Sequence, residues 1–227
     1  MDPVTIAGVT CVAIVSITSH EAAHGFVADR LGDPTARERG RLTLNPLPHI
    51  DLFFTILLPL VLILSGSGFI FGGAKPVPVD VSRLRHPRRD WALVGAAGPG
   101  MNILIAIVLT ALLSAATLTG VADASSSLTA ILAAGIFLNA LLAVFNLIPI
   151  PPLDGSRVMQ YFLSGNALAL YRRLEQFGLL IILGLVFFVP PLQTFLSAAI
   201  FALVAVITTP FGVARDVEPL LRRLLFR

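Results

Sequence analysis

Two histidines and a glutamate are the residues of this sequence whose types and spacing most clearly suggest chemistry. His20, Glu21 and His24 form an H-E-x-x-H motif inside an apolar run, residues 4–27, that is long enough to be a membrane helix. Residues four apart lie on one face of a helix, so both imidazoles can bind one Zn²⁺ while Glu21 reaches a nearby water molecule. Ionisable groups at membrane depth are costly and usually functional. The motif therefore predicts a zinc site within the membrane.

A third zinc ligand has to come from elsewhere, because a catalytic zinc normally takes three protein ligands and keeps a fourth position open. Asp154 is the best candidate, since its carboxylate follows an apolar segment and a run of prolines that release the backbone from helix. The same aspartate could cap a helix that starts near Gly155. His49, Asp51 and His86 are the rival ligands, although none of the three has paired metal spacing.

The composition defines the class of protein. Of the 227 residues, 56% are hydrophobic and 13% are charged, and the mean hydropathy is +0.89. These values predict an integral membrane protein with a single domain, residues 1–227. The net charge of +3 comes without a basic patch interleaved with aromatic residues, so no nucleic-acid partner is expected. The single cysteine, Cys11, cannot form an internal disulfide.

Six apolar segments could position these side chains. They cover residues 4–27, 52–71, 91–118, 128–148, 177–189 (extended back toward 168) and 192–213. The second segment contains Pro59 and then several glycines, which leaves roughly 14 helical residues, about 21 Å long. That length suits a re-entrant hairpin rather than a crossing of the membrane. We therefore expect an all-α polytopic membrane protein with about five transmembrane helices and one re-entrant segment.

The positions of arginine and lysine distinguish the two topologies. If the segment 52–71 crosses, four arginines between residues 30 and 41 lie on one side and the other twelve of the 16 cations on the other. If it re-enters, every loop with a cation and the C-terminal tail share one side. The positive-inside rule favours the second arrangement, with the N-terminus outside and the C-terminus cytoplasmic, in the cell membrane. Asp154 then lies on the same side as His20 and His24, as a shared zinc requires.

Three motifs in this order resemble the site-2 protease family of intramembrane zinc metalloproteases. They are H-E-A-A-H at residues 20–24, G-P-G-M-N at 98–102 and N-L-I-P-I-P-P-L-D-G at 146–155. The glycine and proline of the second motif alone could equally serve helix packing. The resemblance covers most of the chain and points to a compact, core-only branch, because no linker has room for a PDZ-like or a nucleotide-sensing domain.

The resemblance implies the residues of the site. It assigns His20, His24 and Asp154 as ligands of one Zn²⁺ per chain, with Glu21 as general base. Zinc held in this way lowers the pKa of a water molecule towards about 7. The general base then accepts the proton of that water as it attacks a peptide carbonyl, and returns it to the leaving amine.

The resemblance also suggests how a substrate is held. Asn102 and Asn146 resemble polar residues near the metal in this family, and we assign the catalytic role of orienting substrate or stabilising the oxyanion to Asn146 first. Residues 40–46 and 74–79 resemble strand-forming pieces, so a small β-strand element is expected beside the active site. Such an edge could hold an unwound substrate by β-addition.

The function predicted is that of a zinc metalloendopeptidase that cuts a transmembrane protein substrate near its cytoplasmic end, in regulated intramembrane proteolysis within the lipid bilayer. One alternative is a metal-binding membrane transporter, but a transporter favours ligand pairs along several helices, and this chain has only four histidines. Another is an inactive, protease-like scaffold, which the intact Glu21 argues against. Among divalent ions, the expected ligand set of two imidazoles and one carboxylate suits zinc best.

Overall fold

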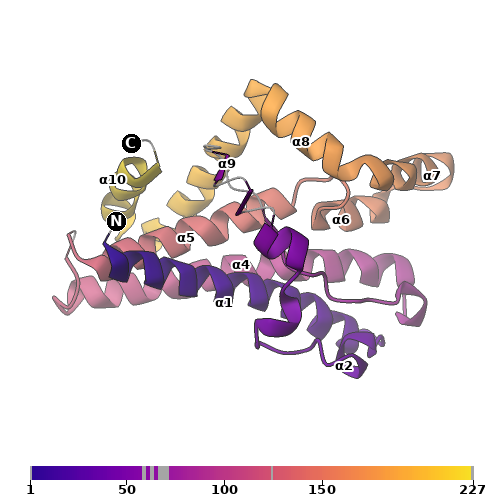
Figure 1. Ribbon diagram of the computed structural model, residues 1–227, viewed down its shortest axis with the longest axis horizontal. Helices are drawn as coiled ribbons and strands as arrows, with labels where there is room; N and C mark the ends of the chain where they lie inside the picture. Colours follow the sequence, from indigo (N-terminus) through magenta and orange to yellow (C-terminus); the bar gives the residue numbers. More distant parts are fainter. Residues whose placement is uncertain (1, 58–59, 62–63, 66–71, 124, 226–227) are drawn as a thin grey trace.

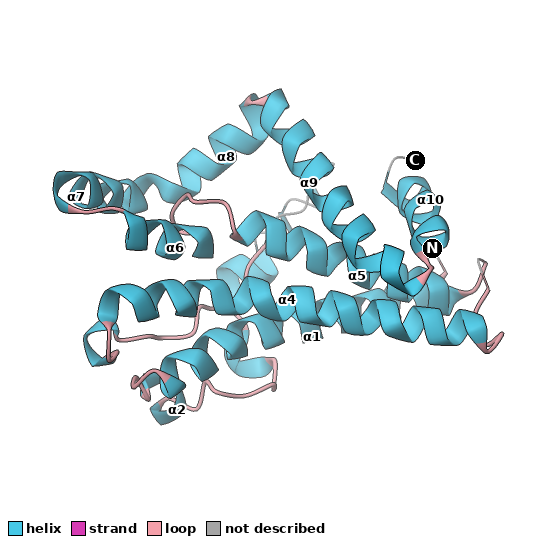
Figure 2. Ribbon diagram, turned by 180° about the vertical axis from the view of Figure 1, so that it is seen from behind, coloured by secondary structure: helices cyan, strands magenta, loops and turns pink. Residues whose placement is uncertain are grey.

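Helices make up all the regular secondary structure that the computed structural model describes, which covers residues 2–57, 60–61, 64–65, 72–123 and 125–225 (Figure 2). The long helices α1 (Pro3–Arg30), α4 (Pro87–Leu118) and α5 (Ser127–Asn146) lie side by side (Figure 1). The remaining helices are α2 (Thr35–Glu38), α6 (Asp154–Phe162), α7 (Gly165–Arg173), α8 (Gly178–Phe188), α9 (Pro190–Thr208) and α10 (Ala214–Leu225). Short helical turns cover Leu47–His49, Leu52–Leu57, Val81–Arg83, Leu174–Phe177 and Thr209–Phe211.

The ends of the long helices follow from local sequence. The side chain of Asp2 accepts the backbone N–H of Thr5 at 2.9 Å and so caps α1. Ser126 caps α5 in the same way, through the N–H of Thr129 at 3.1 Å. Proline begins α4 at Pro87, a position where no intrahelical N–H is needed. Each apolar run therefore starts as a helix at a defined residue.

Four helices are long and apolar enough to cross a membrane: α1, α4, α5 and the stretch Pro190–Phe211 that contains α9. The chain is thus an all-helical, multi-pass membrane protein, as expected. The fifth predicted span, 177–189 with its extension, is instead divided into α7, a 3₁₀ turn and α8. Because α8 has only 11 residues, about 16 Å, it is shorter than a crossing requires. Arg172, Arg173 and Glu175 explain why the apolar run does not continue backward.

The two ends of the described chain meet at one end of the bundle (Figure 1). Ser127 Oγ at the start of α5 donates to Asp2 Oδ2 at 3.3 Å, and Ser114 Oγ in α4 donates to the carbonyl of Phe211 at 2.9 Å. Helices α8 and α9 meet at an angle at Val189 and together carry the chain along the bundle once. Helix α10 therefore lies away from the α6 end, whereas the C-terminal tail was expected on the α6 side.

The predicted β-strand element is not seen among the described residues, and residues 40–46 and 74–79 contain no strand. Proline explains this in part, because Pro76 and Pro78 have no N–H for a strand ladder. Several other polar backbone groups of this segment bind side chains or a loop carbonyl: those of Lys75, the carbonyl of Pro76 and the N–H of Val77. Of the predicted re-entrant segment, residues 52–57 form a π-helix, and most of its second half lies outside the described residues.

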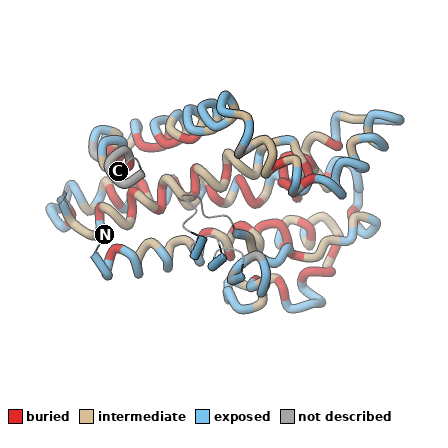
Figure 3. Tube along the Cα trace, turned by 45° about the horizontal axis from the view of Figure 1, so that its top comes forward, coloured by how far each residue is buried: buried red, intermediate tan, exposed pale blue. Residues whose placement is uncertain are grey.

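Buried residues gather where α1, α4 and α5 face one another (Figure 3). Many of them are small, including Ala106 of α4 and Ala133, Ala140 and Ala143 of α5, which are fully buried. Small residues let membrane helices approach closely enough for direct side-chain and backbone contact. The close approach of these three helices is what allows polar side chains from each of them to meet in the interior.

Candidate metal centre

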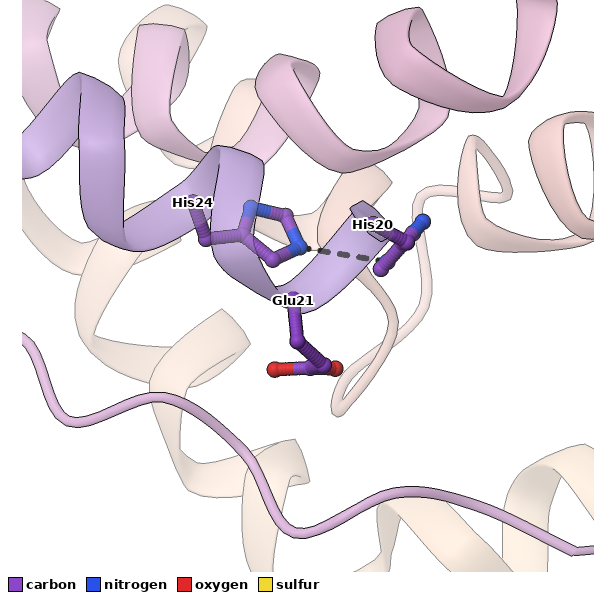
Figure 4. A group of neighbouring side chains, drawn as sticks. All are labelled: His20, Glu21 and His24. Atoms are coloured by element: carbon purple, nitrogen blue, oxygen red, sulfur yellow. Dashed lines mark hydrogen bonds between the residues drawn. The ribbon is translucent and has the colours of Figure 1, made fainter. Parts of the chain in front are cut away.

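Three candidate ligand atoms from distant parts of the chain meet in the bundle. Nε2 of His20 lies 3.1 Å from Oδ2 of Asp154, and Nε2 of His24 lies 3.2 Å from the same oxygen. The two Nε2 atoms are 3.2 Å apart. The His20 and His24 rings approach each other from successive turns of α1 (Figure 4). All three side chains are buried, with 4–7% of each residue exposed, so the triangle is shielded from solvent.

Glycine on α4 makes room for the two imidazoles. A Cβ atom at Gly98 would lie 2.5 Å from Nε2 of His24 and 2.6 Å from Cε1 of His20, closer than any side chain tolerates. Gly95, one turn earlier on the same face, would place a Cβ 2.8 Å from the carbonyl oxygen of Asp154. The glycine of the G-P-G-M-N motif is therefore required by close approach at the site, and not by helix packing alone.

A break in the helix brings Asp154 to the histidines. Helix α5 ends at Asn146, and the proline-rich link after it turns the chain so that α6 begins with Asp154. Gly155 permits this turn, because a Cβ there would lie 2.2 Å from the carbonyl oxygen of Leu147. The L-D-G sequence thus combines a candidate ligand, Asp154, with the glycine that lets it approach the histidines.

Hydrogen bonds fix which nitrogen of each imidazole faces the centre. Nδ1 of His24 lies 2.6 Å from the carbonyl oxygen of Val94, which can only accept, so Nδ1 carries the proton. Nδ1 of His20 lies 2.6 Å from Oδ1 of Asn102, which also accepts. In the neutral rings both Nε2 atoms then present lone pairs to each other and to Asp154. Three acceptors at this separation repel unless a cation or proton lies among them.

A chain of polar side chains holds Asn102 in its orientation. Nδ2 of Asn102 donates to Oδ1 of Asn139 at 2.9 Å, and Nδ2 of Asn139 donates to Oγ of Ser16 at 2.8 Å. Asn102, Asn139 and Ser16 are each fully buried. The chain joins α1, α4 and α5, and it ends at His20. Such partners of a ligating histidine set its tautomer and orientation.

The triangle fits a tetrahedral zinc. Zinc bonds to imidazole nitrogen and carboxylate oxygen are about 2.0–2.1 Å, which corresponds to a separation of about 3.3–3.4 Å between neighbouring ligands of a tetrahedron. The observed separations of 3.1–3.2 Å are close to this value. Three ligands leave the fourth position free, as in catalytic sites.

The carboxylate of Asp154 is held in its charged form. Burial disfavours the charge, but the positive charge of the nearby Arg157 lowers the pKa of Asp154. Arg157 Nη1 lies 3.3 Å from Oδ1 of Asp154, and its guanidinium stacks over the ring of Trp91. A charged carboxylate is the form that binds a metal.

Glu21 lies beside the triangle but is held differently. One of its carboxylate oxygens lies within 4.8 Å of ligand nitrogens of His20 and His24. Its side chain leaves α1 on a different side from the two rings (Figure 4), and its Oε2 accepts the backbone N–H of Val77 at 3.0 Å. This position suits a group that acts on a water molecule at the site better than it suits a fourth ligand.

The other residues singled out in the sequence lie apart from this cluster. Asn146 is the last residue of α5, and its Nδ2 donates to the carbonyl of Leu142 at 3.0 Å. Nε2 of His49 lies 3.0 Å from the carbonyl of Thr43, and His86 precedes α4. Asp51 accepts the backbone N–H of Phe53 at 3.0 Å. Within the described part of the chain, none of these side chains contacts the triangle.

Two residues at the site, Ser16 and Asn139, were not singled out from the sequence, and a third, Asn102, was ranked too low. Asn102 was placed second to Asn146, although its spacing of four from Gly98 puts both on one face of α4. Ser16 has the same spacing from His20, and Asn139 is a polar residue within an apolar helix. Polar residues at helical spacing from the H-E-x-x-H and G-P-G-M-N motifs were therefore the signal that could have identified this hydrogen-bond network.

The bundle of membrane helices holds two imidazoles and one carboxylate in an arrangement that fits a tetrahedral cation, with a glutamate beside them. This is the arrangement expected of an intramembrane metallohydrolase. Residues 114–189 match the model described as "Peptidase family M50". The chain belongs to this family, the site-2 protease family, and it is a zinc metalloprotease.

Relatives that match most of this chain are also described as zinc metalloproteases. The identity is 39% over 185 residues with "Putative zinc metalloprotease YwhC" of Bacillus subtilis, covering 80% of both chains. It is 33% over 201 residues with "Putative zinc metalloprotease Rip2" of Mycobacterium tuberculosis, covering 85% of this chain and 73% of that protein. The Rip2 protein of Mycolicibacterium smegmatis is 33% identical over 177 residues, or 76% of this chain and 63% of its own length. No solved structure matches the chain.

Proposed function

We propose that this zinc metalloprotease is an intramembrane endopeptidase in which His20, His24 and Asp154 hold the metal and Glu21 is the general base. The observation that carries the proposal is the triangle of Nε2, Nε2 and Oδ2 atoms, with edges of 3.1–3.2 Å, whose imidazoles both use Nδ1 for other hydrogen bonds. An arrangement of lone pairs turned toward one point has a clear physical use only when a cation is bound there.

The chemistry divides between the metal and the protein. Bound zinc supplies Lewis acidity, which polarises a peptide carbonyl and lowers the pKa of water at the site. Glu21 accepts the proton of the attacking water and passes it to the leaving amine nitrogen. Asn146 is the proposed donor to the oxyanion, for which its Nδ2 would exchange the carbonyl of Leu142 for the substrate.

An apolar groove beside α1 supports the proposal that the substrate is a transmembrane protein. It has a volume of about 580 Å³ and lies between α1, α4 and the loop Leu42–Leu44, with Phe26 and Met101 among its lining residues. A surface of this kind within the bilayer suits an apolar helix or an extended apolar segment better than a charged peptide. The substrate we propose is therefore a membrane protein cut within or next to its transmembrane segment, as in regulated intramembrane proteolysis.

The distribution of lysine and arginine supports one orientation of the protein in the membrane. Twelve of the sixteen lysines and arginines belong to residues 30–41, 75–89 and 157–173, at the end of the bundle where the site lies. By the positive-inside rule this end faces the cytoplasm of a cell membrane, and cleavage occurs near the cytoplasmic end of the substrate. The N-terminus then lies outside. Because α10 packs against α5 and α9 at the end of the bundle where the N-terminus lies (Figure 1), the described C-terminal end lies on that side as well, in contrast to the sequence-based expectation.

A Glu21→Gln variant tests the proposal. We expect it to retain zinc, because the three ligands are unchanged, and to lose cleavage of a model transmembrane substrate by about 10²- to 10⁴-fold, the usual contribution of a general base. Glu38→Gln, which changes an exposed glutamate paired with Arg83 on the surface, is the matched control and should cleave normally. Unchanged cleavage in Glu21→Gln would exclude Glu21 as the general base. Zinc binding without any cleavage by the parent protein would instead favour a transporter or scaffold role.

A further inference from the structure

The segment Lys75–Val79, which we name the strap, presents one backbone N–H to the catalytic glutamate. Within it, Pro76 and Pro78 have no N–H, so Val77 carries the one donor of the stretch 76–78. This N–H donates to Oε2 of Glu21 at 3.0 Å. Prolines on both sides also restrict the backbone to extended conformations, which keeps the donor in a defined direction.

The strap has a fixed register on α1. The side chain of Val77 is 7% exposed and lies over Gly25, four residues after Glu21 and on the same face of the helix. A Cβ atom at Gly25 would lie 3.1 Å from Cγ1 of Val77 and 3.1 Å from Cβ of Ala36. Gly25 therefore lets the strap approach the helix closely enough for the N–H of Val77 to reach the carboxylate.

Both ends of the strap are anchored by buried groups. Nη2 of Arg41 donates to the carbonyl of Lys75 at 2.7 Å and lies 3.3 Å from that of Pro76. At the other end the N–H of Asp80 donates to Oδ2 of Asp33, a fully buried carboxylate, at 2.6 Å. Val77 lies between these two anchors. The position of its N–H is therefore determined by Arg41 and Asp33 as well as by Gly25.

The burial of Arg41 is costly for folding. The residue is 8% exposed, its Nε has no hydrogen-bond partner, and no ion pair to a carboxylate is found for it among the described residues. A buried guanidinium without a countercharge destabilises the folded state, since its lost hydration is replaced only by bonds to neutral carbonyls. A neutral side chain could hold the loop at a smaller cost. The two carbonyls that Arg41 binds belong to the residues just before Val77, whose N–H donates to Glu21. This position indicates that Arg41 has a role in the site.

From these contacts we infer that Arg41 is a positioning residue for catalysis: it holds the strap so that the N–H of Val77 fixes the carboxylate of Glu21 in its working orientation. The inference rests on the proposed role of Glu21 as general base. Arg41 touches neither the metal ligands nor any reacting atom in this arrangement. Its loss should therefore slow the chemical step without removing the metal.

Kinetics of Arg41→Ala, measured on the full-length protein with a model transmembrane substrate, test the inference. We expect kcat to fall about 10- to 100-fold with little change in KM, as for residues that orient a catalytic group, and zinc content to stay at the parental level. Arg41→Lys keeps a cation that can donate to a carbonyl and should recover part of the loss. Arg39→Ala, which removes an exposed cation two residues earlier, should behave as the parent.

A second variant separates positioning from simple instability. Val77→Pro removes the N–H while keeping an extended backbone, so it should lower kcat as Arg41→Ala does, whereas Val77→Ala keeps the N–H and should lose less. If Arg41 acts through the strap, the double variant Arg41→Ala/Val77→Pro will be little worse than either single variant. Additive losses, a rise in KM with kcat retained, or loss of zinc in Arg41→Ala would each overturn the inference.

Glu21→Gln, measured in the same assay, distinguishes the two levels of failure. If it cleaves at the parental rate, the proposed mechanism is wrong, and the positioning role is rejected with it. If it is inactive while Arg41→Ala is fully active, the mechanism stands and only the role of Arg41 is rejected.

Discussion

Asn102 accepts the Nδ1 proton of His20 at a distance of 2.6 Å, and this contact turns Nε2 of the imidazole toward Asp154 and His24. Replacing Asn102 by leucine keeps the side-chain volume but removes the hydrogen-bond acceptor. We expect Asn102→Leu to weaken zinc binding about 10- to 100-fold, in the range found for partners of ligating histidines. Competition with a chromogenic zinc chelator measures the effect, and an unchanged affinity would show that the contact does not orient His20.

Asn146 tests a different role. If its amide stabilises the oxyanion, Asn146→Ala should lower kcat about 10²- to 10³-fold while zinc affinity stays at the parental value. Its Nδ2 donates to Leu142 in this structure, so the substrate would have to displace a neutral hydrogen bond. Parental kcat in Asn146→Ala would remove it from the catalytic residues and leave Asn102 as the asparagine of the site.

Gly98 and Gly100 form a matched pair on α4. A Cβ at Gly98 would lie 2.5 Å from Nε2 of His24, whereas nothing lies within 4 Å of a Cβ at Gly100. Gly98→Ala should therefore displace the imidazoles and abolish both zinc binding and cleavage. Gly100→Ala should retain both, with a small gain in helix stability of up to about 1 kcal/mol. Equal behaviour of the two variants, measured as metal content and activity, would contradict the close packing described for Gly98.

Asp154 should be needed for the metal as well as for activity. Asp154→Asn keeps the shape but removes the charge, so we expect the zinc content of the purified protein to fall well below one ion per chain, with loss of cleavage. Asp123→Asn, in the loop at the far end of the bundle, serves as the control and should keep its metal. Full zinc occupancy in Asp154→Asn would mean that another group supplies the third ligand.

Metal removal gives a further check that leaves the sequence unchanged. A membrane-permeable chelator should abolish cleavage, and added Zn²⁺ should restore it in the parent but not in Glu21→Gln. The measurement is activity against free Zn²⁺ in detergent solution. Cleavage that persists at low free zinc, with the protein shown by metal analysis to be empty, would rule out zinc catalysis.

Much of the site could be predicted from the sequence because its parts are local. His20, Glu21 and His24 share one helix at fixed spacing, and Asp154 is marked by the proline break before it. The polar chain through Asn139 and the contact with Val94 were not predicted. They depend on how α4 and α5 are rotated against α1, and hydropathy carries little information on rotation when each helix is apolar on every side.

The topology was predicted less well for a related reason. Length and hydropathy count crossings, but α8 has only 11 residues and ends before Pro190, and of the two helices only the stretch from Pro190 is long enough to cross. No strand forms at 40–46 or 74–79, and in the second segment the side chains of Arg41 and Glu21 bind backbone groups that a partner strand would need. A pattern of extended residues predicts the backbone conformation but does not identify its hydrogen-bond partner.

The hydrogen-bond chain from Ser16 through Asn139 and Asn102 to His20 crosses three helices where no bulk water can compete for its members. The orientation of His20 is therefore set by side chains of all three helices in the folded bundle. Metal exchange should then proceed without unfolding, and Co²⁺ should occupy the same tetrahedral position as Zn²⁺. Its visible absorption spectrum would report, in the intact protein, how each ligand changes when a substrate enters.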